Sequence, residues 1–304
     1  MRRWALSLGL VLLACSVDPH RAVRTQAQQL AAKGELESAL ALLDRYVAEH
    51  PAAQSLREEQ FFLLLHADRL ERAVKLMMRQ PSPVRWLGDA LREPDVAIRA
   101  AAARVACDQP QPELLPLLRR RADDPAPEVR RYSARALGCG RDRTALKQLF
   151  RTLHDPNADV RAESAEALMR IGDPRATGWL IVASSDGERQ VRYQVFEALY
   201  ALASQANHAL LRTAWGRVDS KQKLAVAFAL AKLGDATGLP ALLGAATNPD
   251  RDIRRRVAVA LGECGGTAGE KTLRILAEDE ERAVRLAAQT TLDTLHPPAE
   301  TREK

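Results

Sequence analysis

Of the 304 residues of this chain, 46% are apolar but only 4% are aromatic, so alanine and leucine must supply the buried surface, which favours closely stacked helices over a β-sandwich. No run of alternating β-branched residues predicts a strand, so the sequence indicates an all-α protein. The net charge of +6 falls to +4 without residues 1–14 (43 basic against 39 acidic residues), and no basic run is interleaved with aromatic residues, so no nucleic-acid partner is expected.

The N-terminus predicts export. Arg2 and Arg3 precede an apolar stretch over residues 4–14, which is shorter than the roughly 20 residues that a membrane-spanning helix needs. A short positive start followed by such a stretch is typical of a secretory signal peptide. An ordinary signal peptide, followed by a cysteine that carries no lipid, is one interpretation of this pattern.

The end of the signal, Leu12-Leu13-Ala14-Cys15-Ser16, resembles the bacterial lipobox, with Leu13 in place of the family's usual small residue. The resemblance implies cleavage of residues 1–14 and attachment of fatty acyl chains such as palmitate at Cys15. Several acyl chains anchor a protein stably where a single chain does not. Ser16 stands where an inner-membrane retention signal would have Asp, which implies the outer membrane, facing the periplasm.

Residues 22–83, after a short linker over 15–21, contain two copies of a 34-residue period. Gly34-Glu35-Leu36 recurs as Asp68-Arg69-Leu70, and the small residues Ala39 and Ala73 let paired helices approach closely. The pattern resembles the tetratricopeptide repeat, although Asp68 replaces the usual glycine and the family's large aromatic residue is missing. The resemblance implies two helical hairpins, and a generic pair of hairpins is the alternative.

From residue 94 onward the period is 31 residues. One basic residue recurs in each unit: Arg99, Arg130, Arg161, Arg192, Lys223, Arg254 and Arg285. A leucine recurs on the buried face of the second helix of six units: Leu118, Leu149, Leu180, Leu211, Leu242 and Leu273. Asp-Pro pairs such as Asp124-Pro125 are predicted to cap the first helix, and Gly-Asp pairs such as Gly172-Asp173 are predicted to separate the two helices.

This repeat resembles the HEAT-like family in the short bacterial form that bilin-lyase-type proteins share. The resemblance implies a helical-repeat solenoid, a right-handed α-α superhelix of about seven units over residues 84–295, with a truncated unit at 84–91. In the family the recurring basic residue bonds the capping Asp or the backbone between neighbouring units. We therefore expect a structural ladder rather than a phosphate-binding track, and a disordered tail over residues 296–304.

Cys107, Cys139 and Cys264 lie within helical patterns and lack the spacing of metal ligands, so the sequence predicts small buried hydrophobic residues. A Cys107–Cys139 bridge between stacked neighbours is the less favoured alternative.

Residues 262–272 (GECGGTAGEKT) end like a phosphate-binding loop, but Glu270 interrupts the Gly-Lys step and no strand precedes it. An ordinary turn between helices is expected there.

The surface predicted to bind a partner lies on the second helices, on the inside of the curve. At about 100° per residue, the side chains two positions after each buried leucine point most directly outward. They are Arg120, Arg151, Val182, Thr213, Gly244 and Ile275. Arginine and tryptophan are enriched in binding hot spots. The predicted partner-binding residues are therefore Arg119, Arg120, Arg121, Arg151, Trp179 and Val182, and a plain solvated face is the alternative.

No pattern predicts catalysis. The 6 histidines are scattered and no Gly-x-Ser-x-Gly elbow occurs, so neither an active site, a metal nor a cofactor is expected. The predicted function is a membrane-anchored, non-enzymatic scaffold or adaptor that binds other proteins and assists assembly or recruitment of cell-envelope components. The alternative is a ligand-binding or modifying protein on the same fold, bilin-lyase-like or similar to nucleic-acid-binding glycosylases.

Overall fold

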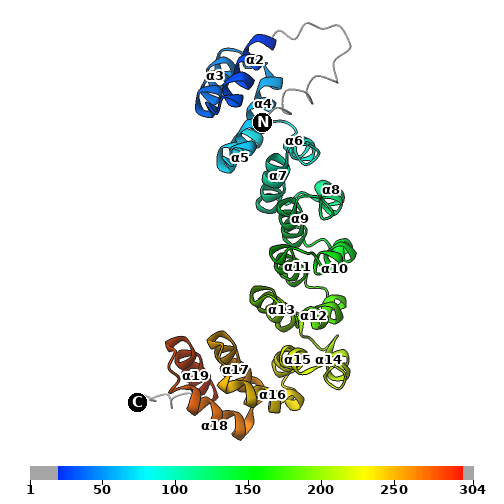
Figure 1. Cartoon of the computed structure of the whole chain (residues 1–304), viewed down its shortest axis with the longest axis vertical. Coiled ribbons are helices and arrows are strands. Elements are labelled where there is room, and N and C mark those ends of the chain that lie inside the picture. The colour runs from blue at the N-terminus through cyan, green and yellow to red at the C-terminus, as the bar shows by residue number, and fades with distance from the viewer. Residues whose placement is uncertain (1–19, 297–304) are drawn as a thin grey trace, which may run out of the picture. The chain divides into compact units, whose positions relative to one another are not determined.

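The computed structural model of the chain describes residues 20–296, and every regular element in that range is a helix (Figure 1). The predicted all-α class is confirmed there. Cys15, the signal peptide and residues 297–304 of the predicted tail lie outside the described residues. The chain divides into two compact units, Met1–Gln148 and Leu149–Lys304, and each is described by itself.

The first unit starts with two helical hairpins and continues with paired helices. Its elements are α2 (Arg21–Ala32), α3 (Leu36–Glu49), α4 (Gln54–His66), α5 (Leu70–Met77), α6 (Pro83–Ala90), α7 (Val96–Asp108), η1 (Pro112–Leu114), α8 (Leu115–Arg121), α9 (Pro127–Cys139) and η2 (Arg143–Ala145). Helix α10 (Leu146–Thr152) contains the boundary between the units.

The hairpins α2–α3 and α4–α5 confirm the two hairpins predicted over residues 22–83. Their turns contain Gly34 at φ 84° and Asp68 at φ 56°, the two positions that the 34-residue period equates. Aspartate enters this left-handed region more readily than most L residues, so it can replace the glycine. Phe61 on α4 packs against Trp86 on α6, with ring centroids 5.4 Å apart, and both rings are buried.

The second unit repeats a pair of short helices. Its remaining elements are α11 (Ala158–Ile171), η3 (Pro174–Ala176), α12 (Thr177–Ala183), α13 (Arg189–Leu202), α14 (His208–Trp215), α15 (Ser220–Lys232), η4 (Ala236–Gly238), α16 (Leu239–Gly244), η5 (Ala245–Thr247), α17 (Arg251–Cys264), α18 (Gly266–Leu276) and α19 (Arg282–Leu295). The last repeat supplies only α19 within the described range.

The predicted leucine column forms the core of the second helices. All six leucines are at most 1% exposed: Leu118, Leu149, Leu180, Leu211, Leu242 and Leu273. Helices this short cannot hide their apolar faces alone, so each repeat depends on its neighbours within the stack. The sequence pattern and the packing therefore agree on a helical solenoid.

Glycine and aspartate form the turn between first and second helices, as predicted. Gly172 ends α11 at φ 71°, and the Asp173 carboxylate then accepts the N–H of Arg175 at 3.0 Å. Within residues 262–272, Gly265 connects α17 to α18. A Cβ atom at Gly265 would lie 2.4 Å from the carbonyl oxygen of Leu261, so only glycine fits. The expected ordinary turn is confirmed.

The prediction that Asp-Pro pairs cap the first helices is wrong in detail. Helix α9 begins at Pro127 with Ala126 as its N-cap, and the Asp124 carboxylate accepts the N–H of Ala126 at 3.0 Å. In α11 the N-cap is Asn157, whose own N–H donates to Asp155 at 2.9 Å. The aspartate therefore closes the turn before the helix, and its second oxygen remains available for another partner.

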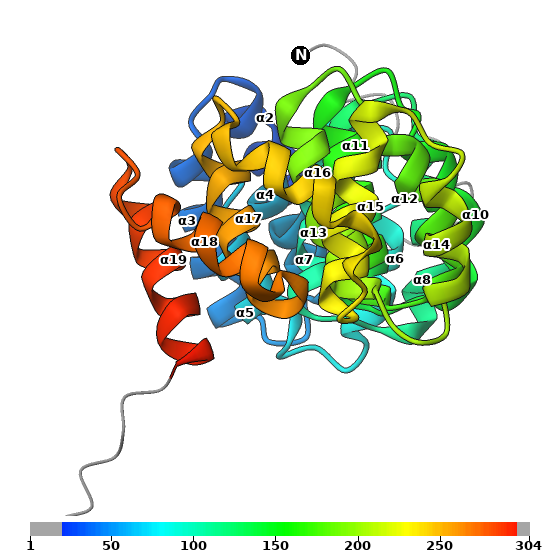
Figure 2. The same ribbon diagram turned by 90° about the horizontal axis from the view of Figure 1, so that it is seen from below.

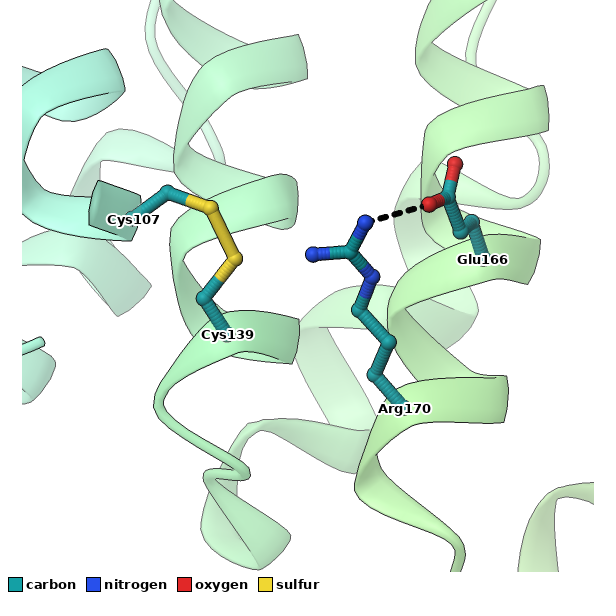
Figure 3. Close-up of a disulfide and its surroundings, with 4 residues drawn as sticks. All are labelled: Cys107, Cys139, Glu166 and Arg170. Carbon is teal, nitrogen blue, oxygen red and sulfur yellow. Dashed lines mark hydrogen bonds and ion pairs between the residues drawn. A yellow bond between two sulfur atoms is a disulfide. The ribbon is translucent and has the colours of Figure 1, made fainter.

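The favoured prediction for the cysteines is wrong for Cys107 and Cys139, and the less favoured alternative, a bridge between stacked neighbours, is confirmed. Cys107 near the end of α7 and Cys139 at the end of α9 form a disulfide, with Cα atoms 5.3 Å apart (Figure 3). The bridge links the first helices of two successive repeats within the first unit. Of the described cysteines, Cys264 is free and half-buried.

Candidate interaction surface

Arginines of the recurring basic column form a structural ladder, as predicted, whereas Lys223 lies over the Trp215 ring. Arg99, Arg161 and Arg254 each present the Nε–Nη2 edge of the guanidinium, here called the fork, to the two oxygens of the aspartate that lies 25 positions later. The bonds measure 2.7–3.0 Å, and the aspartates are Asp124, Asp186 and Asp279. Such paired, charge-assisted bonds are among the strongest in proteins.

The same arginines also bind the backbone of their own repeat. In each case Nη1 donates to two carbonyl oxygens at the start of the unit, those of Asp155 and Pro156 for Arg161. Burial would raise the pKa of Asp186, but the hydrogen bonds from Arg161 and from the Glu188 N–H, together with the charges of Arg161 and Arg192, lower that pKa below its ordinary value. These guanidiniums are therefore occupied in holding repeats together.

The predicted outward row of the second helices is exposed at each of its six positions, from Arg120 to Ile275. Two of these side chains are large and apolar, Val182 at 56% and Ile275 at 71% exposed. The helical geometry behind the prediction is thus confirmed. The row does not lie in one unit, because Arg120 belongs to the first and the other five positions belong to the second.

In the first unit, two of the three predicted binding arginines on α8 are engaged inside the chain. Arg119 pairs with Asp142 at 2.5 Å, and Arg121 pairs with Asp124 at 3.2 Å. Arg120 between them is exposed. Of the basic run on α8, Arg120 is therefore the side chain best placed to reach a partner.

In the second unit, Arg151, Trp179 and Val182 belong to one surface that we call the α10–α12 patch, defined by Phe150, Arg151, Trp179 and Val182. The half-buried rings of Phe150 on α10 and Trp179 on α12 lie with centroids 4.9 Å apart. The His154 ring also contacts the Phe150 ring, edge-on, with centroids 5.0 Å apart. The patch combines two aromatic rings, an exposed aliphatic side chain and an exposed arginine.

Sequence reasoning missed Phe150. It directly follows the buried Leu149, and Trp179 directly precedes the equivalent Leu180, so the period gives no sign that the rings meet. Phe150 and Trp179 lie on opposite sides of equivalent leucines in the sequence. Whether their rings meet depends on the offset between the neighbouring helices along their axes. A search for aromatic residues next to Trp179 in adjacent repeats would have proposed the pair.

The second helices do not line the inner side of the curve within the second unit, so that prediction is wrong there. The first helices α13, α15 and α17 lie on the inner side of its bend (Figure 1). Arg189 on α13 reaches past α15 to Asp250 and Asp252 at 2.7 and 2.8 Å, two repeats later in the chain. Figure 2 shows α13, α15 and α17 as neighbours from below.

A cavity of about 420 Å³ opens among these three first helices. Phe196, Leu224 and Ile253 supply apolar lining, and charged groups from the three helices and their connecting loops also line it. Arg256 on α17 lies over the Tyr193 ring, 4.4 Å from its centroid. The sequence-predicted binding residues are not among the residues that line this cavity.

Within residues 20–296, none of the helices is long and apolar enough to cross a membrane. Within the same range, no three His, Cys, Asp or Glu side chains gather in a group that could hold a metal ion.

The comparisons with solved structures give low similarity in sequence. The complex of CpcE and CpcF of phycocyanin lyase from Nostoc sp. PCC7120 is 22% identical, with 70% of this chain and 87% of that chain covered and a TM-score of 0.44. Human deoxyhypusine hydroxylase in complex with glycerol is 21% identical over 80% of this chain and 98% of that chain, with a TM-score of 0.32. An engineered protein is 18% identical over 90% of this chain and 83% of that chain, with a TM-score of 0.46. Among curated proteins, none matches.

A family model gives the clear assignment. The model for HEAT repeats matches residues 84–152, 122–200, 144–227 and 209–293. These overlapping matches together extend from 84 to 293, which is more than half of the chain, and they coincide with the paired helices of the 31-residue period. The chain belongs to the HEAT repeat family.

Proposed function

We propose that this chain is a non-catalytic interaction protein of the bacterial cell envelope, held to the outer membrane by lipid at Cys15, that recruits or assembles envelope proteins. The observation that carries the proposal is the α10–α12 patch. Arginine and tryptophan are the side chains most enriched in binding hot spots, and hot spots act where rings are packed and desolvated. Trp179 is already held by Phe150, so little side-chain freedom is lost on binding.

The repeat architecture supports the same function. Stacked repeats offer a long surface whose side chains are fixed by ladder bonds and buried leucines rather than by loops. Arg151 and Val182 stand exposed on α10 and α12 beside the aromatic pair. Rigid helices that present exposed side chains beside an aromatic pair suit a protein partner better than a small molecule.

The disulfide supports the proposed compartment. Disulfides persist in oxidising spaces such as the bacterial periplasm and are rare in the cytosol. Cys107 and Cys139 are bonded in the first unit, while the N-terminal residues form a signal that resembles a lipobox. Both features support an exported chain.

The test is chemical crosslinking in intact cells followed by mass spectrometry of the captured proteins. The wild-type chain is expected to capture a small set of envelope proteins, and Trp179→Ala or Val182→Glu is expected to reduce their recovery about tenfold or more. Thr213→Glu is the matched control, because Thr213 is the equivalent exposed position one repeat after Val182. Equal capture by all four proteins, or capture of no envelope protein, would show that the patch is not a binding surface.

A further inference from the structure

The ladder is interrupted at Arg192. The Nη1 atom of Arg192 donates to the carbonyl oxygens of Asp186 and Gly187, both at 2.8 Å, as the other ladder arginines do in their own repeats. In the ladder pairs an aspartate follows 25 positions later, but here that position is Arg217. A guanidinium cannot accept a hydrogen bond. Within residues 20–296, the fork of Arg192 therefore has no carboxylate partner.

The open fork belongs to the cavity among α13, α15 and α17, because Arg192 is one of its lining residues. Of the other three cations of the lining, Arg189 pairs with Asp250 and Arg256 pairs with Glu197. Lys221 at the start of α15 is exposed. Phe196 and Leu224 add apolar surface to the lining. A volume of about 420 Å³ suits a few side chains and not a folded domain.

The acidic groups of the cavity are already engaged. Asp186 holds the fork of Arg161, and Asp250 and Asp252 both accept from Arg189. Asp250 also caps α17 through the N–H of Asp252. None of the three accepts a hydrogen bond from the fork of Arg192, although Asp186 attracts the Arg192 charge, so the fork is open to a further carboxylate and Lys221 adds positive charge to the same lining.

We propose that this cavity binds an acidic segment of a partner protein, in which an Asp or Glu side chain takes the place of the carboxylate missing from the ladder. The partner's carboxylate accepts from Nε and Nη2 of Arg192, in the geometry that Asp186 shows with Arg161 and Asp279 shows with Arg254. An apolar residue next to it in the segment packs on Phe196 and Leu224, and Lys221 adds a second contact. The proposal rests on the proposed function and names the chemistry of one partner segment.

Arg285 provides an internal control for this assignment. Its Nη1 atom donates to the carbonyl oxygens of Asp279 and Glu280 at 2.7 and 2.8 Å, and no carboxylate meets its fork within the described residues. Arg285 does not line the cavity among α13, α15 and α17. Outside the cavity its fork lacks the lining that Lys221, Phe196 and Leu224 supply, so it is expected to gain little from a single carboxylate.

The test uses a random twelve-residue peptide library displayed on phage, selected against the full chain and then measured as free peptides by fluorescence anisotropy. Selected peptides are expected to carry Asp or Glu next to an apolar residue. Changing that acid to its amide is expected to weaken binding about tenfold or more, since charge-assisted paired bonds are lost. Arg192→Gln is expected to weaken binding equally, whereas Arg285→Gln leaves it unchanged.

Arg217→Asp places a carboxylate of the chain itself 25 positions after Arg192, where it can accept from Nε and Nη2 of Arg192. This variant therefore tests the proposal most directly. It is expected to abolish peptide binding and to raise the midpoint of urea unfolding, while Arg217→Ala does neither. A library that yields no peptide dependent on Arg192, or acidic peptides that bind Arg217→Asp as tightly as the wild type, would overturn the proposal. Peptides that depend on Trp179 but not on Arg192 would overturn it and leave the proposed function intact.

Discussion

Two guanidinium nitrogens of Arg161 on α11 contact the two carboxylate oxygens of Asp186, which precedes α13. Nε and Nη2 donate at 2.7 and 3.0 Å, across 25 positions of sequence. The remaining nitrogen, Nη1, donates to the carbonyl oxygens of Asp155 and Pro156 at 2.8 and 3.2 Å. One side chain thus joins the start of its own repeat to the start of the next.

Arg161→Ala is expected to lower the free energy of unfolding by about 3 kcal/mol, because removal of one partner leaves the other charge largely buried. The Asp186 side chain is only 12% exposed, so water compensates it poorly. Urea unfolding followed by circular dichroism measures the loss. The matched control is Arg170→Ala, which breaks an i,i+4 pair with Glu166 at 2.6 Å and should cost a few tenths of a kcal/mol. Equal losses in both variants would mean that the ladder does not stabilise the repeats.

The parts of the fold that recur with the 31-residue period could be predicted from the sequence. The leucine column, the Gly172-Asp173 turn and the basic ladder each repeat at one position, and a repeated position meets the same neighbours in each unit. The outward row followed from helical geometry alone, since Val182 and Ile275 lie opposite buried leucines.

What breaks the period could not be predicted in the same way. The Cys107–Cys139 bond joins neighbouring repeats at positions 32 residues apart, which the 31-residue period does not equate, so the sequence offered it only as the less favoured alternative. The inner side of the bend in the second unit depends on how each repeat rotates relative to the next, which the period does not specify. Arg217 was visible in the sequence as a departure from the aspartate column, but only the geometry of Arg161 shows what that departure leaves open.

Arg141 offers a stabilising substitution. It lies in the turn after α9 at φ 48°, where the equivalent residue of the next repeat is Gly172 at φ 71°. A residue that carries a Cβ atom costs about 1 kcal/mol in this backbone region, so Arg141→Gly is expected to recover part of that and raise the thermal midpoint. Differential scanning calorimetry of the two proteins measures the change.

The reciprocal variant, Gly172→Ala, controls for packing. A Cβ atom at Gly172 would meet nothing within 4 Å, so only the backbone conformation opposes the substitution. Gly172→Ala is expected to lower the thermal midpoint by about as much as Arg141→Gly raises it. If Arg141→Gly lowers the midpoint instead, the flexibility that glycine adds to the unfolded chain outweighs the strain.

Asp235 is expected to make the free energy of unfolding depend on pH under acidic conditions. Burial would raise the pKa of Asp235, but hydrogen bonds from Thr237 and His208 lower it to about 2, against an ordinary value of 3.8. A pKa lowered by folding stabilises the folded state above 3.8, and this contribution is lost as the pH falls from 3.8 towards 2. The free energy of unfolding of wild type and Asp235→Asn should therefore differ at neutral pH and converge across that window. A constant difference down to the lower end would contradict the assignment of the shift to Asp235.

Cys15 decides whether the chain is a lipoprotein. Each buried CH₂ of an acyl chain contributes about 0.8 kcal/mol to membrane binding, so losing all the chains at once should release the protein. Cys15→Ala is expected to move the chain from the membrane fraction to the soluble fraction of lysed cells, with an unchanged circular dichroism spectrum. Cys264→Ala, which removes the free thiol of α17, should stay with the membranes. If Cys15→Ala also stays in the membrane fraction, residues other than Cys15 hold the chain to the membrane, and the lipid anchor at Cys15 is wrong.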